Sequence, residues 1–306
     1  MTLLYQFIVM LSKTYSISLL FNILEISKSA FYAWQRKESY QRSVVKAVKS
    51  AHVKAVFEEH RRRYGTRRIV AELQEQGVKI GRYQVRSLME QQELVAIQPK
   101  SFVPKTTNSL HGLGRSPNLL LNADGTYRKP TKPHEIYVGD ITYIPLVKGD
   151  FLYLATFQDM YTRVIVGWEL MDNMNIQLTI NALQKSINRN TLSKGLIIHS
   201  DGGGQYAGHR FKQLLLAHDF LSSMTRRDNH YDNAMGESLF SRFKAELLQK
   251  GAFENLEAAY TEIFEYIELY YNKKRRHSGI NYDFPERFEK RFWEKKKNDE
   301  LCAIKE

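Results

Sequence analysis

Residues 137–144 read Tyr-Val-Gly-Asp-Ile-Thr-Tyr-Ile, and this stretch decides the fold expected for the second half of the chain. Apolar and polar side chains alternate along it, a pattern that predicts a half-buried β-strand. Asp140 lies in the middle of this strand. A buried charge is costly without a partner, so the pattern marks Asp140 as a candidate functional residue.

The residues after this strand alternate between strand and helix patterns. The sequence predicts strands over 151–157, 164–170, 196–199 and 220–224, and helices over 176–187, 211–217, 233–250 and 256–273. The first three strands form a meander, with a turn at 159–163, and helices then alternate with strands. This order predicts an α/β fold with a mixed sheet flanked by helices.

The first 97 residues show helical patterns throughout. We expect two or three short helices within 1–37 and a longer one over 44–60. Thr66 is a candidate N-cap for a helix that ends at Gly77, and Gly81 opens another. A helix, a glycine-containing turn and a basic helix are typical of a helix-turn-helix region. The alternative is a small three-helix bundle with a solvated basic face.

The net charge of +12 is concentrated at one end of the chain. Residues 1–130 hold 21 Lys and Arg against 9 acids, whereas residues 131–306 hold 24 of each. A basic half next to a neutral half predicts a DNA-binding region joined to a region with another task. The candidate DNA contacts in the basic half are Arg63, Arg67, Arg68, Arg82 and Arg86.

Length and composition set further limits. A chain of 306 residues predicts about two domains. The single cysteine, Cys302, permits no intramolecular disulfide and no cysteine-based zinc finger, which fits a reducing cytoplasm. Residues 1–11 are apolar but too short to span a bilayer, so we expect no membrane partner. Residues 98–131 carry four prolines and little periodicity, which predicts a linker.

Three acidic residues are candidates for metal-dependent chemistry. Asp140 lies within a strand, Asp201 directly follows the strand at 196–199, and Glu237 begins a long helix. If the first and fourth strands pair, the two aspartates become neighbours, and a helix packed on that edge could add Glu237. Oxygen ligands favour Mg²⁺ or Mn²⁺, and a pair of such ions serves in-line phosphoryl displacement. With 33 acidic residues in the chain, spacing alone leaves other triplets open.

Six strings together resemble a known family. Asp201 and Glu237 have 35 residues between them, and Lys244 follows seven residues after the glutamate. The strings are SKSAFYAW, RRRYGTRRIVAELQEQG, VGDITYI, HSDGGGQY, SMTRRDNHYDNAMGESLFSRFKAEL and YYNKKRRHSGINYDFPERF. In this order they resemble the OrfB-type transposases of the insertion-sequence-three family, relatives of retroviral integrases with a DDE core.

The resemblance implies an RNase H-like catalytic core preceded by an all-α helix-turn-helix region. It implies a polynucleotidyl transferase that cuts and joins transposon ends using two Mg²⁺ or Mn²⁺ ions, with Asp140, Asp201 and Glu237 as catalytic metal ligands. The expected domains are a helical region over 1–97, a linker over 98–131, a core over 132–292 and a charged tail over 293–306. Unlike retroviral integrase, this chain lacks the cysteines of a His/Cys zinc domain.

The implied partners are the DNA duplexes of transposon ends and target. The family also implies an oligomer on DNA, a small DNA-binding partner or fusion from an upstream reading frame, and a bacterial cytoplasmic location associated with the nucleoid. Two other functions stay open: an inactive DNA-binding regulator, and a metal nuclease that cleaves without joining.

Some candidate residues have two interpretations. Lys244 is either a DNA contact or a solvated lysine, and Arg275 with Arg276 either touch the DNA backbone or decorate an exposed helix end. Asp232 is more consistent with an N-cap than with catalysis. The glycines at 202–204 form either a tight turn or a phosphate cradle.

Overall fold

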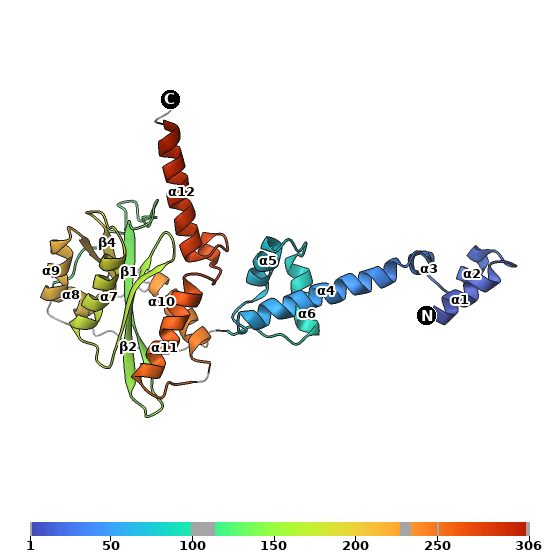
Figure 1. The fold of residues 1–306 in the computed structure, drawn as a ribbon, viewed down its shortest axis with the longest axis horizontal. Coiled ribbons are helices and arrows are strands. Elements are labelled where there is room, and N and C mark those ends of the chain that lie inside the picture. Colours follow the sequence, from blue (N-terminus) through green and yellow to red (C-terminus); the bar gives the residue numbers. More distant parts are fainter. Residues whose placement is uncertain (1, 99–113, 227–233, 250, 304–306) are drawn as a thin grey trace. The chain divides into compact units, whose positions relative to one another are not determined.

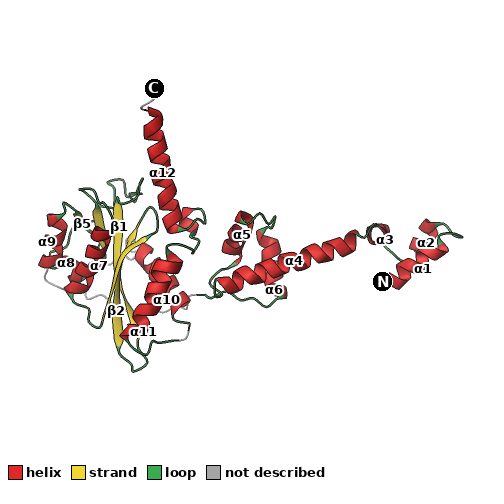
Figure 2. Ribbon diagram, viewed as in Figure 1, coloured by secondary structure: helices red, strands yellow, loops and turns green. Residues whose placement is uncertain are grey.

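The computed structural model describes residues 2–98, 114–226, 234–249 and 251–303. The chain divides into two compact units, Met1–Ile97 and Gln98–Glu306. Within the described residues the first unit is helical, and all five strands lie in the second unit (Figure 2). The combination of a helical region and an α/β core confirms the predicted fold class.

The first unit contains two small hydrophobic cores. Helices α1 (Thr2–Leu11), α2 (Ile17–Ile23) and α3 (Lys28–Gln35) share one core, built from Tyr5, Ile8, Leu20, Phe21 and Phe31. Helices α4 (Glu38–Glu59), α5 (Thr66–Glu75) and α6 (Arg82–Gln91) share the other, built from Val53, Val56, Phe57, Tyr64, Ile69, Leu73, Ile80, Val85, Leu88 and Met89.

The pair α5 and α6 has the expected helix-turn-helix layout. Gly77 has a φ of 81°, a conformation that glycine adopts without steric cost, and it turns the chain after α5. Gly81 is the N-cap of α6, as predicted, whereas Gly65 rather than Thr66 precedes α5. Helix α4 begins at Glu38, six residues earlier than expected, because its first turns are polar and carry no apolar periodicity.

The second unit is built on a five-stranded mixed sheet. Its strands are β1 (Ile136–Pro145), β2 (Phe151–Asp159), β3 (Ile165–Met171), β4 (Ile197–Ser200) and β5 (Leu221–Met224), in the order β3-β2-β1-β4-β5. β1, β2 and β3 pair antiparallel, and β4 runs parallel to β1 and β5. The expected pairing of the first and fourth strands is therefore confirmed.

Helices cover both faces of this sheet (Figure 1). Helices α7 (Ile176–Arg189), α8 (Gly204–Ala207) and α9 (His209–Ala217) pack on one face around Phe157 and Leu183. Helices α10 (Ala234–Leu247) and α11 (Leu256–Phe264), with the π-helical segment Glu265–Tyr271, pack on the other face around Phe243 and Ile263. Helix α12 (Pro285–Ala303) runs across residue 292, where we expected the core to end.

Part of the predicted linker belongs to the sheet unit. The backbone N–H of Leu119 donates to Ser223 Oγ at 2.9 Å, and Ser116 Oγ donates to Ser222 Oγ at 2.8 Å. Leu120 is buried against Ile136. Residues 114–120 thus follow the edge strand β5, whose unpaired side would otherwise be exposed. The proline content of residues 98–131 indicated only a linker. The packing of residues 114–120 could not be read from the sequence, because their contacts are with a strand about a hundred residues away in the chain.

Among the described residues, no helix is long and apolar enough to cross a membrane.

Candidate active site

The sheet brings Asp140 and Asp201 to adjacent positions. In the parallel pair of β1 and β4, Gly139 lies opposite Ser200, and each aspartate is the next residue of its chain segment. Gly139 is packed closely, because a Cβ there would overlap the ring of Phe157. Both aspartates are partly exposed. The fold therefore places two carboxylates side by side, within reach of solvent.

The buried Tyr206 of α8 interacts electrostatically with both carboxylates. Its side chain is 1% exposed, and burial raises its pKa well above 10.0. The charges of Asp201 and Asp140 raise this pKa further, because a phenolate beside two carboxylates is disfavoured. Both carboxylates are therefore close enough to the Tyr206 hydroxyl to shift its pKa. Sequence analysis did not single out Tyr206; its only signal was its place in the string that carries Asp201.

Backbone amides orient one oxygen of each aspartate. The N–H of Ile141 donates to Asp140 Oδ1 at 2.9 Å, and the N–H of Gly203 donates to Asp201 Oδ1 at 3.1 Å. Hydrogen bonds of this kind favour the ionised carboxylate. Two oriented carboxylates form the hard oxygen donor set that Mg²⁺ and Mn²⁺ prefer. Asp140 and Asp201 therefore fit a divalent cation.

Lys244 of α10 lies near Asp140. It is partly buried, and desolvation lowers its pKa from the ordinary value of 10.5. The negative charge of Asp140 acts in the opposite direction and favours the ammonium form. The side chain is therefore not a fully solvated lysine, and it contributes positive charge beside Asp140.

Glu237 does not join the two aspartates in this structure. It lies in the first turn of α10, and its side chain is exposed. Within the described residues, no group of three His, Cys, Asp or Glu side chains is close enough to hold a metal ion. The structure therefore brings together two of the three predicted acids. Asp232, the predicted N-cap, lies outside the described residues.

The glycines after Asp201 form a turn into a short helix. Gly203 is the N-cap of α8, and Gly202 lies against the guanidinium of Arg115. The neighbouring His199 is buried between β4 and β5, with Nδ1 2.8 Å from Ser223 Oγ. His199 therefore ties two strands together.

The structure contradicts the predicted DNA contacts of Arg275 and Arg276. Arg275 is 2% exposed and donates from Nε and Nη2 to both carboxylate oxygens of Glu246, at 2.7 and 2.6 Å. Arg276 is 3% exposed, donates to the carbonyl of Tyr282 and lies over the ring of Phe284. Both guanidinium groups are used inside the unit, so neither reaches a DNA phosphate.

The five arginines of the first unit differ in exposure. Arg67, Arg82 and Arg86 are exposed, although Arg86 pairs with Glu90 at 2.8 Å. Arg68 is partly buried, lies over the ring of Tyr64 and donates to the carbonyl of Arg63. Arg63 itself is buried at 9% exposure, which does not favour its predicted phosphate contact.

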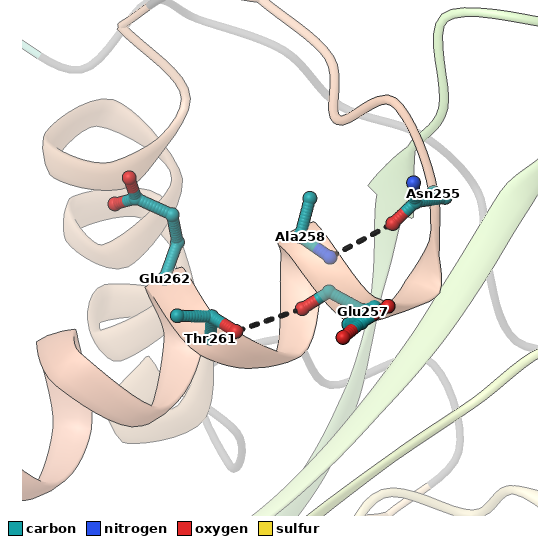
Figure 3. Close-up of a pocket in the computed structure, with 5 residues that line it drawn as sticks. All are labelled: Asn255, Glu257, Ala258, Thr261 and Glu262. Carbon is teal, nitrogen blue, oxygen red and sulfur yellow. Dashed lines mark hydrogen bonds between the residues drawn. The ribbon is translucent and has the colours of Figure 1, made fainter.

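A surface hollow of about 390 Å³ lies at the N-terminus of α11 (Figure 3). Its lining residues are Asn255, Glu257, Ala258, Thr261 and Glu262. Asn255 accepts a hydrogen bond from the N–H of Ala258 at 2.9 Å, and Thr261 donates to the carbonyl of Glu257 at 3.0 Å (Figure 3). These bonds cap and close the first turns of α11, so the hollow is explained by helix geometry.

Comparison with known families matches both units. Two models described as integrase core domain match residues 130–230 and 237–291, and a model described as HTH-like domain matches residues 46–102. The first integrase match includes Asp140 and Asp201, and the second begins at Glu237.

The chain is also similar to named bacterial proteins. It is 38% identical over 255 residues to the transposase for insertion sequence element IS904 of Lactococcus lactis, covering 83% of this chain and 98% of that protein. It is 33% identical over 290 residues to the transposase InsF for insertion sequence IS3A of Escherichia coli, covering 93% and 98%. Among solved structures, the catalytic core domain of HTLV-2 integrase in complex with magnesium matches at 15% identity and a TM-score of 0.39, covering 52% of this chain and 98% of that one.

Near-complete alignment at these identities, together with an HTH-like region followed by an integrase core, confirms the resemblance seen in the sequence: the chain belongs to the IS3 family of insertion-sequence transposases.

Proposed function

We infer that this chain is a DNA transposase that cleaves the ends of a mobile element and joins them to target DNA. The observation that carries this function is the adjacent pair Asp140 and Asp201 on β1 and after β4, inside a matched integrase core. Such a core, joined to an HTH-like unit, combines strand-transfer chemistry with a means of binding DNA.

We propose Asp140, Asp201 and Glu237 as the catalytic acids that hold Mg²⁺ or Mn²⁺. A bound pair of such ions would activate the attacking oxygen and stabilise the leaving oxygen of an in-line displacement. Orientation of Asp140 and Asp201 by the amides of Ile141 and Gly203 supports their assignment. For Glu237 the support is its position at the start of the second integrase-core match, and the proposal requires α10 to bring it to the aspartates.

The reaction needs no covalent enzyme intermediate. In cleavage, water attacks the phosphorus at the element's end and a 3′-hydroxyl leaves. In joining, that 3′-hydroxyl attacks a target phosphodiester, the P–O3′ bond of the target strand breaks, and the 3′-hydroxyl of the cut target strand leaves. We assign Lys244 to the DNA backbone near the reacting phosphate, since it adds positive charge beside Asp140.

We propose that the exposed Arg67, Arg82 and Arg86, with the partly buried Arg68, contact DNA from α5 and α6. The predicted division of labour follows: residues 1–97 bind the element's ends, and the integrase core performs the chemistry. Because its relatives are transposases of bacterial insertion sequences, we propose that the chain acts on nucleoid DNA in the bacterial cytoplasm. We further propose that it acts as an oligomer assembled on the ends, with a small upstream-frame partner or fusion.

The test is product analysis with end-labelled duplexes that carry the element's terminal repeats. Joined products in Mg²⁺ or Mn²⁺, absent in EDTA and absent with Asp140→Asn, support a transposase. Cleaved ends without joining would identify a metal nuclease instead. Binding without either product in any of these metals would identify a DNA-binding regulator.

A further inference from the structure

Arg115 lies directly against the turn that carries Asp201. It belongs to residues 114–120, the segment that follows β5, and its guanidinium occupies the space next to Gly202 that a side chain would fill. Of all atoms near position 202, those of this guanidinium are the nearest that a Cβ would meet. Only a glycine at 202 therefore leaves room for Arg115 beside the candidate catalytic acid.

A second contact fixes the guanidinium in this place. Arg115 Nη2 donates to the carbonyl of Thr225 at 2.9 Å, and the N–H of Thr225 donates to the carbonyl of Ser200 at 3.0 Å. Arg115 thus connects the residue after β5 to the turn after β4. This chain of contacts ends at Ser200, the residue before Asp201.

The arrangement is costly if stability is its purpose. Arg115 Nη1 is buried and has no hydrogen-bond partner among the described residues. A buried donor in this condition is destabilising, and a side chain without that donor would avoid the cost. An arginine at this position is therefore better explained by what it does to the turn beneath it.

We propose that Arg115 is a positioning residue for Asp201. It covers Gly202, is held by Thr225, and keeps the 201–203 turn where Asp201 lies beside Asp140. This inference rests on the proposed role of Asp201 as a metal ligand, and it makes the segment before β1 part of the active site.

Two variants remove the contact from opposite sides. Arg115→Ala deletes the guanidinium. Gly202→Ala expels it with one methyl group, and Gly202 does not have a positive φ, so alanine fits the backbone. Each should weaken Mn²⁺ binding to the full chain, followed by electron paramagnetic resonance, by about tenfold to a hundredfold, as expected for groups that orient metal ligands. The double variant should lose no more than either single variant, because both remove one contact.

The controls separate positioning from folding. DNA affinity should stay unchanged in both variants, and Arg115→Ala should unfold at no lower temperature than the wild type, because it removes the unpartnered donor. Arg128→Ala, which removes an exposed arginine paired with Glu135, should leave Mn²⁺ binding intact. Arg115→Lys should behave like alanine, because an ammonium lacks the planar group that covers Gly202. Normal Mn²⁺ binding in Arg115→Ala, full rescue by lysine, or additive losses in the double variant would each overturn the proposal. Asp201→Asn separates failure of this proposal from failure of the proposed function. If this variant binds Mn²⁺ normally, Asp201 is not a metal ligand, and the proposed role of Asp201 has failed instead.

Discussion

At the scale of single residues, the two aspartates owe their state to different neighbours. Asp140 is a strand residue whose charge is favoured by the amide of Ile141, and it acts on Lys244 across the site. Asp201 is a turn residue whose charge is favoured by the amide of Gly203. Tyr206 senses both from the core. Each carboxylate is therefore oriented by a backbone amide of its own segment.

We predict that Asp140→Asn and Asp201→Asn each abolish cleavage and joining while DNA affinity stays within twofold. Replacing the carboxylate by an amide removes the negative charge that holds the cation. The loss of activity should exceed the roughly tenfold to hundredfold loss expected for residues that only orient metal ligands. Labelled-end assays beside a mobility-shift titration measure both quantities. Ser238→Ala, an exposed neighbour of Glu237, is the matched control. Wild-type joining by either aspartate variant would refute the metal assignment.

The lowered pKa of Lys244 gives a pH prediction. Between that pKa and the ordinary 10.5, the unfolded chain binds a proton that the folded chain does not, so stability rises with pH in this window. Lys244→Met should remove this rise of stability with pH. Asp140→Asn should extend the rise to lower pH, because the negative charge of Asp140 raises the pKa of Lys244. Urea unfolding of residues 106–306 from pH 7 to 10.5 measures it. A slope identical in wild type and Lys244→Met would contradict it.

At the scale of elements, a buried network fixes the helices that cover one face of the sheet. The carboxylate of Glu246 in α10 accepts hydrogen bonds from the guanidinium of Arg275 and, at 2.8 Å, from the hydroxyl of Tyr266. Asn272 binds both the N–H and the carbonyl of Ile165 in β3. These bonds hold α10 against α11 and the sheet, and α10 is the helix that carries Glu237 and Lys244.

We predict that Arg275→Met destabilises the second unit by about 3–5 kcal/mol, because it leaves the Glu246 carboxylate buried without its cation. Arg242→Met, on the exposed side of the same helix, should change stability by less than about 0.5 kcal/mol. Denaturant unfolding measures both. If Arg275→Met kept full stability and lost DNA affinity, the original expectation of a DNA contact would be right.

At the scale of the whole molecule, the basic excess is concentrated in the helical unit. Residues 1–97 hold 16 Lys and Arg against 8 acids, whereas residues 98–306 hold 29 against 25. Since residues 114–120 pack on β5, a cut that respects both units falls before residue 114. Residues 1–105 then hold 18 Lys and Arg against 8 acids.

We predict that a fragment of residues 1–105 keeps most of the DNA affinity and most of its salt dependence, whereas residues 106–306 bind duplex DNA weakly. Each phosphate contact contributes a slope of about −0.9 in log K against log salt. In the full chain, Arg67→Ala should flatten the slope by about one unit. Arg63→Ala, at the buried arginine, should leave it unchanged. Salt titrations of DNA binding by the full chain, the two fragments and the two variants measure these slopes. If residues 106–306 carried the affinity, the assignment of DNA binding to the helical unit would be reversed.

Local pattern was sufficient for most of the elements, although it missed α12 and the start of α4. Alternation along 137–144 predicted β1, helical periodicity predicted α5 and α6, and the charge count separated the two units. These features were readable because they depend on residues a few positions apart. Asp140, Asp201 and Glu237 were likewise found from their places in strand, strand end and helix, together with the family strings.

Only the tertiary structure decided which side chains meet. Arg275 and Arg276 look like a basic surface run, yet pairing with Glu246 and stacking on Phe284 bury them. Arg115 looks like a linker residue, yet it lies beside Asp201 because β4 and β5 are neighbours. A charged side chain gains or loses its partner through contacts between residues tens to a hundred positions apart, and no local pattern encodes them. The sequence by itself thus determined most of the elements and the candidate acids, while the packing of the sheet and its helices decided which charges are free to meet DNA.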